Sequence, residues 1–238
     1  MDLHQENTAN LEPVGSESIS NSLRVNFVLK VFGITAIQLA FTSILAYLAI
    51  SSSGFSTFQK SNPRSILVAF IPNFVLHSAI NASDTLTKKV PLNYIILGVF
   101  TLDQSYIVSV IANTSDKEVV FSTIFVIAAV VSVLALYALR SKTEINMMRG
   151  LILLLSLASP VILVLSWIMS FKFMASLYFG VIAIMSGLFL IYDIKKIMGK
   201  ENRKISLDDY IRGALMLYGD ITWIFLAIHQ IEGKEKEN

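Results

Sequence analysis

Two aspartates lie within apolar stretches near the end of the chain, Asp193 in SGLFLIYDIKKIMG and Asp220 in ALMLYGDITWIFLAI. An ionised carboxylate in the hydrocarbon of a bilayer costs about 2.5 kcal/mol or more. Two carboxylates held close together cannot both ionise cheaply, so they share a proton and titrate as one unit. Carboxylate oxygens also suit Ca²⁺, although a tight calcium site needs about six to eight oxygens. The pattern predicts a proton-sensitive pair that doubles as a weak transit site for Ca²⁺.

Three further polar residues lie in apolar stretches, Asp103 and Gln104 in VFTLDQSYIVSV and His77 in FVLHSAI. Asp103 either extends a polar path from Asp220 or hydrogen-bonds between helices. His77 either titrates near neutral pH or packs inside the bundle. Both alternatives remain open from the sequence, and we treat His77 and Gln104 as accessory candidates.

The composition indicates an integral membrane protein. Only 15% of the residues are charged, against about 25% in soluble domains. Mean hydropathy is +0.65, and apolar runs of about 20 residues, each long enough to cross a bilayer, recur along the chain. The absence of cysteine excludes disulfides, thiolate catalysis and cysteine-based metal sites. The net charge of +2 is too small to indicate a nucleic-acid partner.

We expect an all-α membrane protein, a bundle of seven transmembrane helices in which short connections make successive helices antiparallel. Residues 1–23 are polar and acidic and are expected to form a disordered cytosolic tail. Residues 24–232 are expected to form the membrane domain and residues 233–238 a short charged tail. The expected spans are residues 25–50, 65–83, 91–113, 119–139, 150–170, 173–198 and 208–231.

Basic residues gather in the loops on one side of this expected bundle. The positive-inside rule places that side and the N-terminus in the cytosol. Seven full crossings would leave the C-terminus outside, whereas a re-entrant seventh segment would return it to the cytosol. The basic residues on the expected cytosolic side are Arg24, Lys30, Lys88, Lys89, Arg140, Lys142, Arg149, Lys195, Lys196, Lys200, Arg203, Lys204 and Arg212.

Five segments carry a resemblance to a known family. They are RVNFVLKVFGITAIQLAFTSILA from Arg24, PLNYIILGVFTL from Pro91, ALYALRSKTEIN at 135–146, and LIYDIKKIMG followed by SLDDYIRGALMLYGDI. In this order and spacing, residues 24–231 resemble the Bax inhibitor/Lifeguard family of transmembrane Bax-inhibitor-motif proteins. The last pair of segments is the most specific part of the match.

The resemblance implies a seven-helix bundle in endoplasmic reticulum or Golgi membranes. It implies a pH-sensitive Ca²⁺ leak that contributes to calcium homeostasis and suppression of cell death. The family's aspartate pair falls on Asp193 and Asp220, and its third-helix acid falls near Gln104, one position after Asp103. The family's basic partner in the second helix has no counterpart in a span that offers only His77. No enzymatic activity and no cofactor are implied; Ca²⁺ is the transported ion.

Two other classes of function remain open. A non-conducting membrane protein would act as a regulator or adaptor of cell-death proteins or calcium channels. An intramembrane aspartyl protease would use a proton-sharing aspartate pair as its acid and base. Tyr192-Asp193 and Gly219-Asp220 are similar to the sequences around such pairs, but Leu217 interrupts the Gly-x-Gly-Asp pattern. In each case the implied partners include the lipid bilayer.

Overall fold

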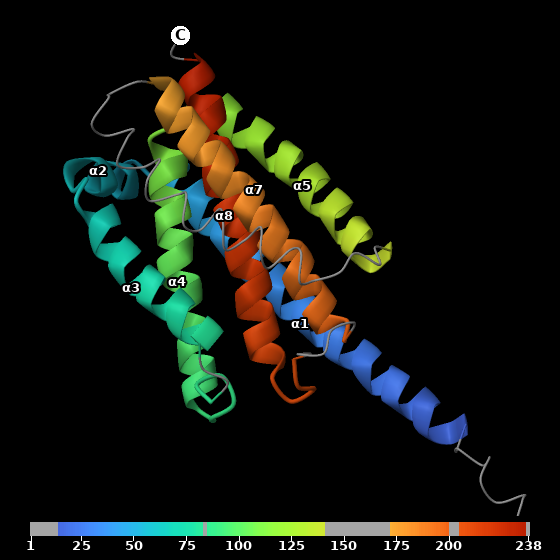
Figure 1. The fold of residues 1–238 in the computed structure, drawn as a ribbon. Coiled ribbons are helices and arrows are strands. Elements are labelled where there is room, and N and C mark those ends of the chain that lie inside the picture. Colours follow the sequence, from blue (N-terminus) through green and yellow to red (C-terminus); the bar gives the residue numbers. More distant parts are fainter. Residues whose placement is uncertain (1–13, 83–84, 141–171, 200–204, 237–238) are drawn as a thin grey trace, which may run out of the picture.

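The computed structural model describes residues 14–82, 85–140, 172–199 and 205–236. All regular secondary structure in these ranges is helical, which confirms the expected all-α class (Figure 1). The helices are α1 (Val14–Ser51), α2 (Ser53–Ser61), α3 (Ser65–Ala82), α4 (Leu92–Asn113), α5 (Lys117–Arg140), α7 (Lys172–Ile197) and α8 (Tyr210–Lys236).

Five helices within the described ranges are long and apolar enough to cross a membrane. Their spans are Ser22–Ser51, Leu92–Asn113, Lys117–Ala138, Leu177–Ile197 and Tyr210–Ile231. Helices α2 and α3 pass the same test only together, as a pair bent by 84°, which raises the number to six if the pair is one span. The expected span at residues 150–170 lies outside the described residues, so the expected total of seven is not confirmed.

The bend between α2 and α3 falls at Asn62-Pro63-Arg64, and the sequence analysis did not expect a separate helix before it. Proline lacks the backbone N–H that a continuing helix needs. The amide of Asn62 donates to the Phe58 carbonyl at 2.9 Å, and the Ser65 hydroxyl donates to the Asn62 carbonyl at 2.7 Å. The backbone N–H groups of Asn62 and Ser65 donate to the same two carbonyls, at 3.1 and 2.9 Å, so each carbonyl accepts two bonds at the break.

Helix α1 begins at Val14, within the segment expected to be a disordered tail. The helical backbone therefore starts before the apolar stretch, whose span begins at Ser22. At the other end of the chain, α8 is the most buried of the five spans and has α1, α4, α5 and α7 around it (Figure 1). A polar side chain on the buried face of α8 consequently lies inside the bundle, where it needs a partner.

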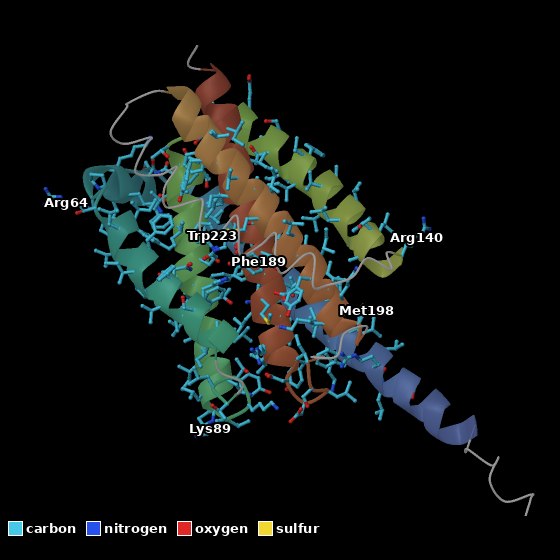
Figure 2. All side chains as sticks on the ribbon, in the orientation of Figure 1. Arg64, Lys89, Arg140, Phe189, Met198 and Trp223 are labelled. Carbon is cyan, nitrogen blue, oxygen red and sulfur yellow. The ribbon has the colours of Figure 1, made fainter. Side chains whose placement is uncertain are left out.

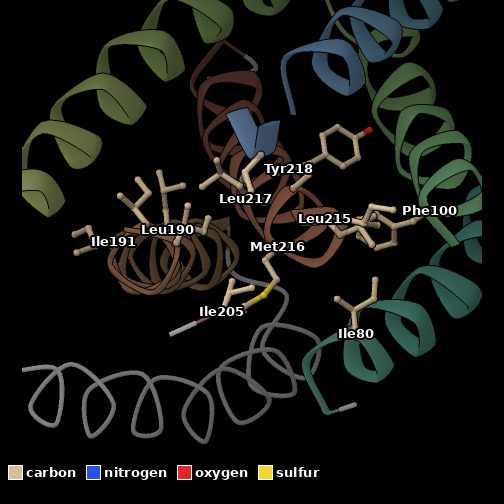
Figure 3. Close-up of a cluster of buried hydrophobic side chains, with 14 of the residues drawn as sticks. Ile80, Phe100, Leu190, Ile191, Ile205, Leu215, Met216, Leu217 and Tyr218 are labelled. Atoms are coloured by element: carbon tan, nitrogen blue, oxygen red, sulfur yellow. The ribbon is translucent and has the colours of Figure 1, made fainter. Parts of the chain in front are cut away.

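The hydrophobic core surrounds α8 and joins it to its neighbours. Ile80 of α3, Phe100 of α4, Leu190 of α7 and Tyr218 of α8 belong to one buried cluster (Figure 3). Gly213 permits a close approach to α1, because a Cβ there would lie 3.0 Å from a Val31 methyl group. This packing fixes the rotation of α8 about its axis and therefore the directions of its polar side chains.

The ends of the bundle carry charged side chains. Figure 2 shows Lys89, Arg140 and Met198 toward one end of the bundle and Arg64 toward the other. Lys89 and Arg140 are among the basic residues that the sequence assigns to the expected cytosolic side, and Arg64 is not among them. Their placement follows from the antiparallel succession of the helices.

Candidate functional site

Asp193 and Asp220 meet between α7 and α8. Their side chains are 4% and 5% exposed, and the two carboxyl groups are hydrogen-bonded to each other. The two helices pack side by side over much of their length (Figure 1). Asp193 lies near the end of α7, and Asp220 lies about 15 Å from the start of α8. The structure thus brings the two predicted residues together, away from water.

A hydrogen bond between two carboxyl groups requires a proton on one of them. A neutral carboxylic acid then donates to the oxygen of a carboxylate, which is a short, charge-assisted bond. Loss of that proton would leave two like charges in contact inside the bundle, and these would repel each other. In this geometry, removal of the proton would weaken the contact between α7 and α8 at the pair.

One positive charge lies beside the pair. Lys196 Nζ is 3.9 Å from Asp193 Oδ1, three residues further along α7, and also lies over the Tyr192 ring at 5.1 Å from its centroid. Its charge stabilises negative charge on the neighbouring Asp193. Within the described part of the chain, Asp220 Oδ2 has no hydrogen-bond partner. That oxygen is a buried acceptor whose bonding capacity is not used by hydrogen bonds within the described residues.

The carboxyl pair alone does not form a tight metal site. It offers fewer oxygens than the about six to eight that surround Ca²⁺ in high-affinity sites. Across the residues that the structure describes, no cluster of three or more His, Cys, Asp or Glu side chains could hold a metal ion. Chemically, the arrangement suits brief contact with a passing cation.

Arg24 of α1 holds the end of α7. Its Nη2 donates to the Lys196 carbonyl at 2.7 Å, and its Nη1 donates to the Ile205 carbonyl at 2.7 Å. Gly199 follows with φ of +71°, and a Cβ there would lie 2.8 Å from Arg24 Nε, so only glycine fits. The sequence analysis counted Arg24 as a basic loop residue and missed this contact.

Asp209 holds the start of α8. Its buried carboxylate accepts a hydrogen bond from the backbone N–H of Arg212, as an N-cap residue does. Burial raises the pKa of Asp209 above its ordinary value, against the opposing effects of this bond and of Lys88. An aspartate directly before an apolar helix is a sequence signal for such a cap, and it was not used.

Asp103 and Gln104 belong to a polar chain that joins three helices. Asp103 is hydrogen-bonded to Asn73 of α3. Asn73 Nδ2 donates to Gln104 Oε1, and Gln104 Nε2 donates to Thr222 Oγ1 at 2.6 Å. Asn73 and Gln104 are fully buried. Asp103 therefore makes a bond between helices, one of its two expected alternatives, and Gln104 reaches α8 two residues after Asp220.

His77 lies against α8 at the residue before Asp220. A Cβ on Gly219 would be 3.3 Å from both Nδ1 and Cε1 of His77, so the glycine makes room for the ring. The ring also stacks on Phe100, with centroids 6.3 Å apart and planes at 25°. His77 is thus packed within the bundle, next to the backbone that carries Asp220.

A second polar group, which the sequence analysis missed, consists of hydroxyls. The Tyr218 hydroxyl lies 2.7 Å from Thr42 Oγ1 and 3.2 Å from Ser105 Oγ, and these two oxygens are 2.8 Å apart. Serine and threonine are common in membrane helices, so the sequence does not distinguish these three residues. Together they tie α1 and α4 to α8 two residues before Asp220.

Comparison with known proteins gives one family. The family model described as "Inhibitor of apoptosis-promoting Bax1" matches residues 24–237, a range that includes both aspartates.

Three relatives match most of the chain. Protein lifeguard 3 of Mus musculus is 25% identical over 232 residues, covering 93% of this chain and 75% of the relative. Protein lifeguard 3 of Homo sapiens is 26% identical over 215 residues, covering 89% and 69%. BI1-like protein of Arabidopsis thaliana is 26% identical over 218 residues, covering 89% and 81%.

Proposed function

The chain belongs to the Bax inhibitor family, and on that premise we propose that it is a pH-sensitive Ca²⁺ leak channel. Family membership implies an anti-apoptotic membrane protein. The proposal adds that the protein lies in endoplasmic reticulum or Golgi membranes with a cytosolic N-terminus, and that the leak contributes to calcium homeostasis and the suppression of cell death. The observation that carries it is the buried, hydrogen-bonded pair of Asp193 and Asp220.

In the proposed mechanism the pair is a latch between α7 and α8. While one proton is shared, the carboxyl groups hold the two helices together at that depth. When the proton leaves, the two charges repel, and the separated carboxylates attract water and a cation. Ca²⁺ then passes as the transported ion, held weakly by the oxygens of Asp193 and Asp220.

The accessory residues support the latch by fixing α8. Gln104 binds Thr222 and His77 packs on Gly219, so both act on the helix turn that carries Asp220. Asp103 and Asn73 extend the polar chain toward α3. We propose that this chain keeps α8 in register while α7 moves, because each broken hydrogen bond inside a membrane bundle costs about 0.6 kcal/mol or more.

Purified protein in liposomes tests the proposal. Vesicles contain a Ca²⁺ indicator, the external pH is varied without a pH gradient, and no other protein is present. Ca²⁺ entry that changes with pH supports the channel. Folded, membrane-inserted protein that admits no Ca²⁺ at any pH contradicts it and supports a regulator or adaptor of other channels or cell-death proteins.

A further inference from the structure

A groove between α1 and α5 lies apart from the aspartate pair. Its volume is about 860 Å³, and neither Asp193 nor Asp220 lines it. Helices α1 and α5 form its walls, and residues of α4 and α8 form its floor. Representative lining residues are Tyr47, Ile50, Val108, Phe121, Ile124 and Phe225.

The lining is mainly apolar and its outer edge faces the surroundings of the bundle. Tyr47, Phe121 and Ile124 are 69%, 63% and 47% exposed. Because α1 and α5 qualify as membrane spans, the surroundings at this depth are lipid hydrocarbon. An acyl chain is therefore the molecule that is present there at high concentration and matches the lining in polarity.

The groove is long enough to hold an acyl chain. The lining residues of α5 run from Lys117 to Ser132, about 22 Å along the helix axis. This exceeds the thickness of one hydrocarbon leaflet, about 15 Å, so an extended acyl chain fits lengthwise.

The two threonines that line the groove have hydrogen-bonded hydroxyls. The Thr42 hydroxyl donates to the Gln38 carbonyl at 2.9 Å, and the Thr222 hydroxyl donates to the Tyr218 carbonyl at 2.9 Å. Thr222 Oγ1 also accepts the bond from Gln104. An apolar chain can cover these groups without leaving a buried donor unpaired.

The groove has a charged end. Lys117, the first residue of α5, lines it there together with Ser51 of α1. Asp116 and Glu118 flank the lysine in the sequence, so charges of both signs lie at this end. A headgroup that carries a phosphate and an ammonium group is complementary to such a mixture. We propose that the groove binds one acyl chain of a zwitterionic glycerophospholipid, with its phosphate near Lys117.

Photolabelling in nanodiscs tests this site without any measurement of Ca²⁺ flux. The full chain is placed in phosphatidylcholine nanodiscs that contain a trace of phosphatidylcholine with a diazirine near the end of one acyl chain. After irradiation, mass spectrometry maps the labelled residues. We expect labels to concentrate on the groove faces of α1 and α5. Labels spread evenly over outer residues such as Phe74 and Phe125 would overturn the proposal.

Two neighbouring alanines provide a matched pair of variants. Ala128 lines the groove, whereas Ala129 is exposed and does not. We expect Ala128→Trp to fill the groove and to reduce its labelling by roughly fivefold or more, while Ala129→Trp stays within about twofold of the wild type. Equal labelling of the two variants would contradict the site. If Ala128→Trp does not fold, Ser43→Trp on the opposite wall replaces it.

The headgroup is tested with a second probe that carries the same diazirine chain on phosphatidylserine. We expect weaker labelling of the groove than with the choline lipid, because Asp116 and Glu118 repel the additional negative charge. Stronger labelling by the serine lipid would overturn the assignment of a zwitterionic headgroup.

Discussion

Arg24 Nη2 donates a 2.7 Å hydrogen bond to the carbonyl oxygen of Lys196, in the last turn of α7. The last carbonyl groups of a helix have no helical partners, and a positive charge at this end is favourable. The same guanidinium binds the Ile205 carbonyl, which precedes α8. Arg24 thus connects the first span to the segment between the two helices that carry Asp193 and Asp220.

Arg24→Gln is expected to destabilise the protein by about 1–3 kcal/mol, because one or both charge-assisted bonds are lost. Thermal unfolding in detergent measures the effect. Lys30→Gln serves as the control, since Lys30 is an exposed cation of the same helix that lies over the Tyr210 ring at 5.5 Å and is expected to contribute less. A loss no larger than that of Lys30→Gln would show that the Arg24 contacts are not stabilising.

A double-mutant cycle tests the bond between Gln104 and Thr222. The single variants Gln104→Leu and Thr222→Val and their combination should give a coupling energy of about 0.6–1.7 kcal/mol. Unfolding free energies of the four proteins supply the value. In a control cycle, Thr123→Val on α5 replaces Thr222→Val. The unfolding free-energy changes of Gln104→Leu and Thr123→Val should then be additive. A coupling energy of equal size in both cycles would refute a specific bond between Gln104 and Thr222.

The aspartate pair and the accessory residues could be anticipated from the sequence, whereas the contacts of the accessory residues could not. Asp193 and Asp220 lie on consecutive helices, which must pack as antiparallel neighbours. Gln104 and Thr222 are 118 residues apart, on helices that are not consecutive. Spans that are apolar on all sides do not indicate which face meets which neighbour, so periodicity carries no information about such contacts.

Helix α2 and the start of α1 are two further features that the sequence pattern does not predict. The short helix α2 packs on α4 through Gln59, which donates to Ser109 Oγ at 2.9 Å. This contact joins residues 50 positions apart, so the local sequence pattern does not indicate it. The helical start of α1 at Val14 lies in a polar stretch whose composition alone predicts disorder.

The buried carboxyl of Asp209 predicts a pH-dependent contribution to stability. Because its pKa is raised in the folded state, folding favours the protonated form. The contribution of Asp209 to the free energy of unfolding is therefore most favourable below the ordinary pKa of about 3.9. This contribution is lost as the pH rises from that value through the raised pKa of the folded state. Asp209→Asn keeps a capping oxygen and cannot ionise, so it should remove this dependence.

Thermal unfolding of wild type and Asp209→Asn over a pH series measures that difference. The stability of the wild type relative to the variant should fall with rising pH and then level off. Asp208→Asn is the control, because Asp208 is exposed and the hydrogen bond from Ser206 lowers its pKa. A wild-type curve parallel to that of Asp209→Asn would contradict the raised pKa.

Asp193→Asn should also flatten the dependence of Ca²⁺ flux on pH. The sequence alone favours a weaker effect at this position, closer to the cytosolic face, than at Asp220. The structure shows both carboxyls similarly buried and bonded to each other, so either amide removes the shared proton. Flux through liposomes checks this, and a profile like that of the exposed Asp208→Asn variant would exclude Asp193 from the latch.

The most direct measurement compares Ca²⁺ flux across a pH series for wild type, Asp220→Asn and Asp220→Ala in liposomes. The amide can still hydrogen-bond to Asp193 but has no proton to lose over the range of about pH 5 to 8, whereas alanine removes the bond. The account predicts a pH-dependent wild type, a low and flat profile for Asp220→Asn, and a raised and flat profile for Asp220→Ala. A pH profile in both variants that matches the wild type would contradict it.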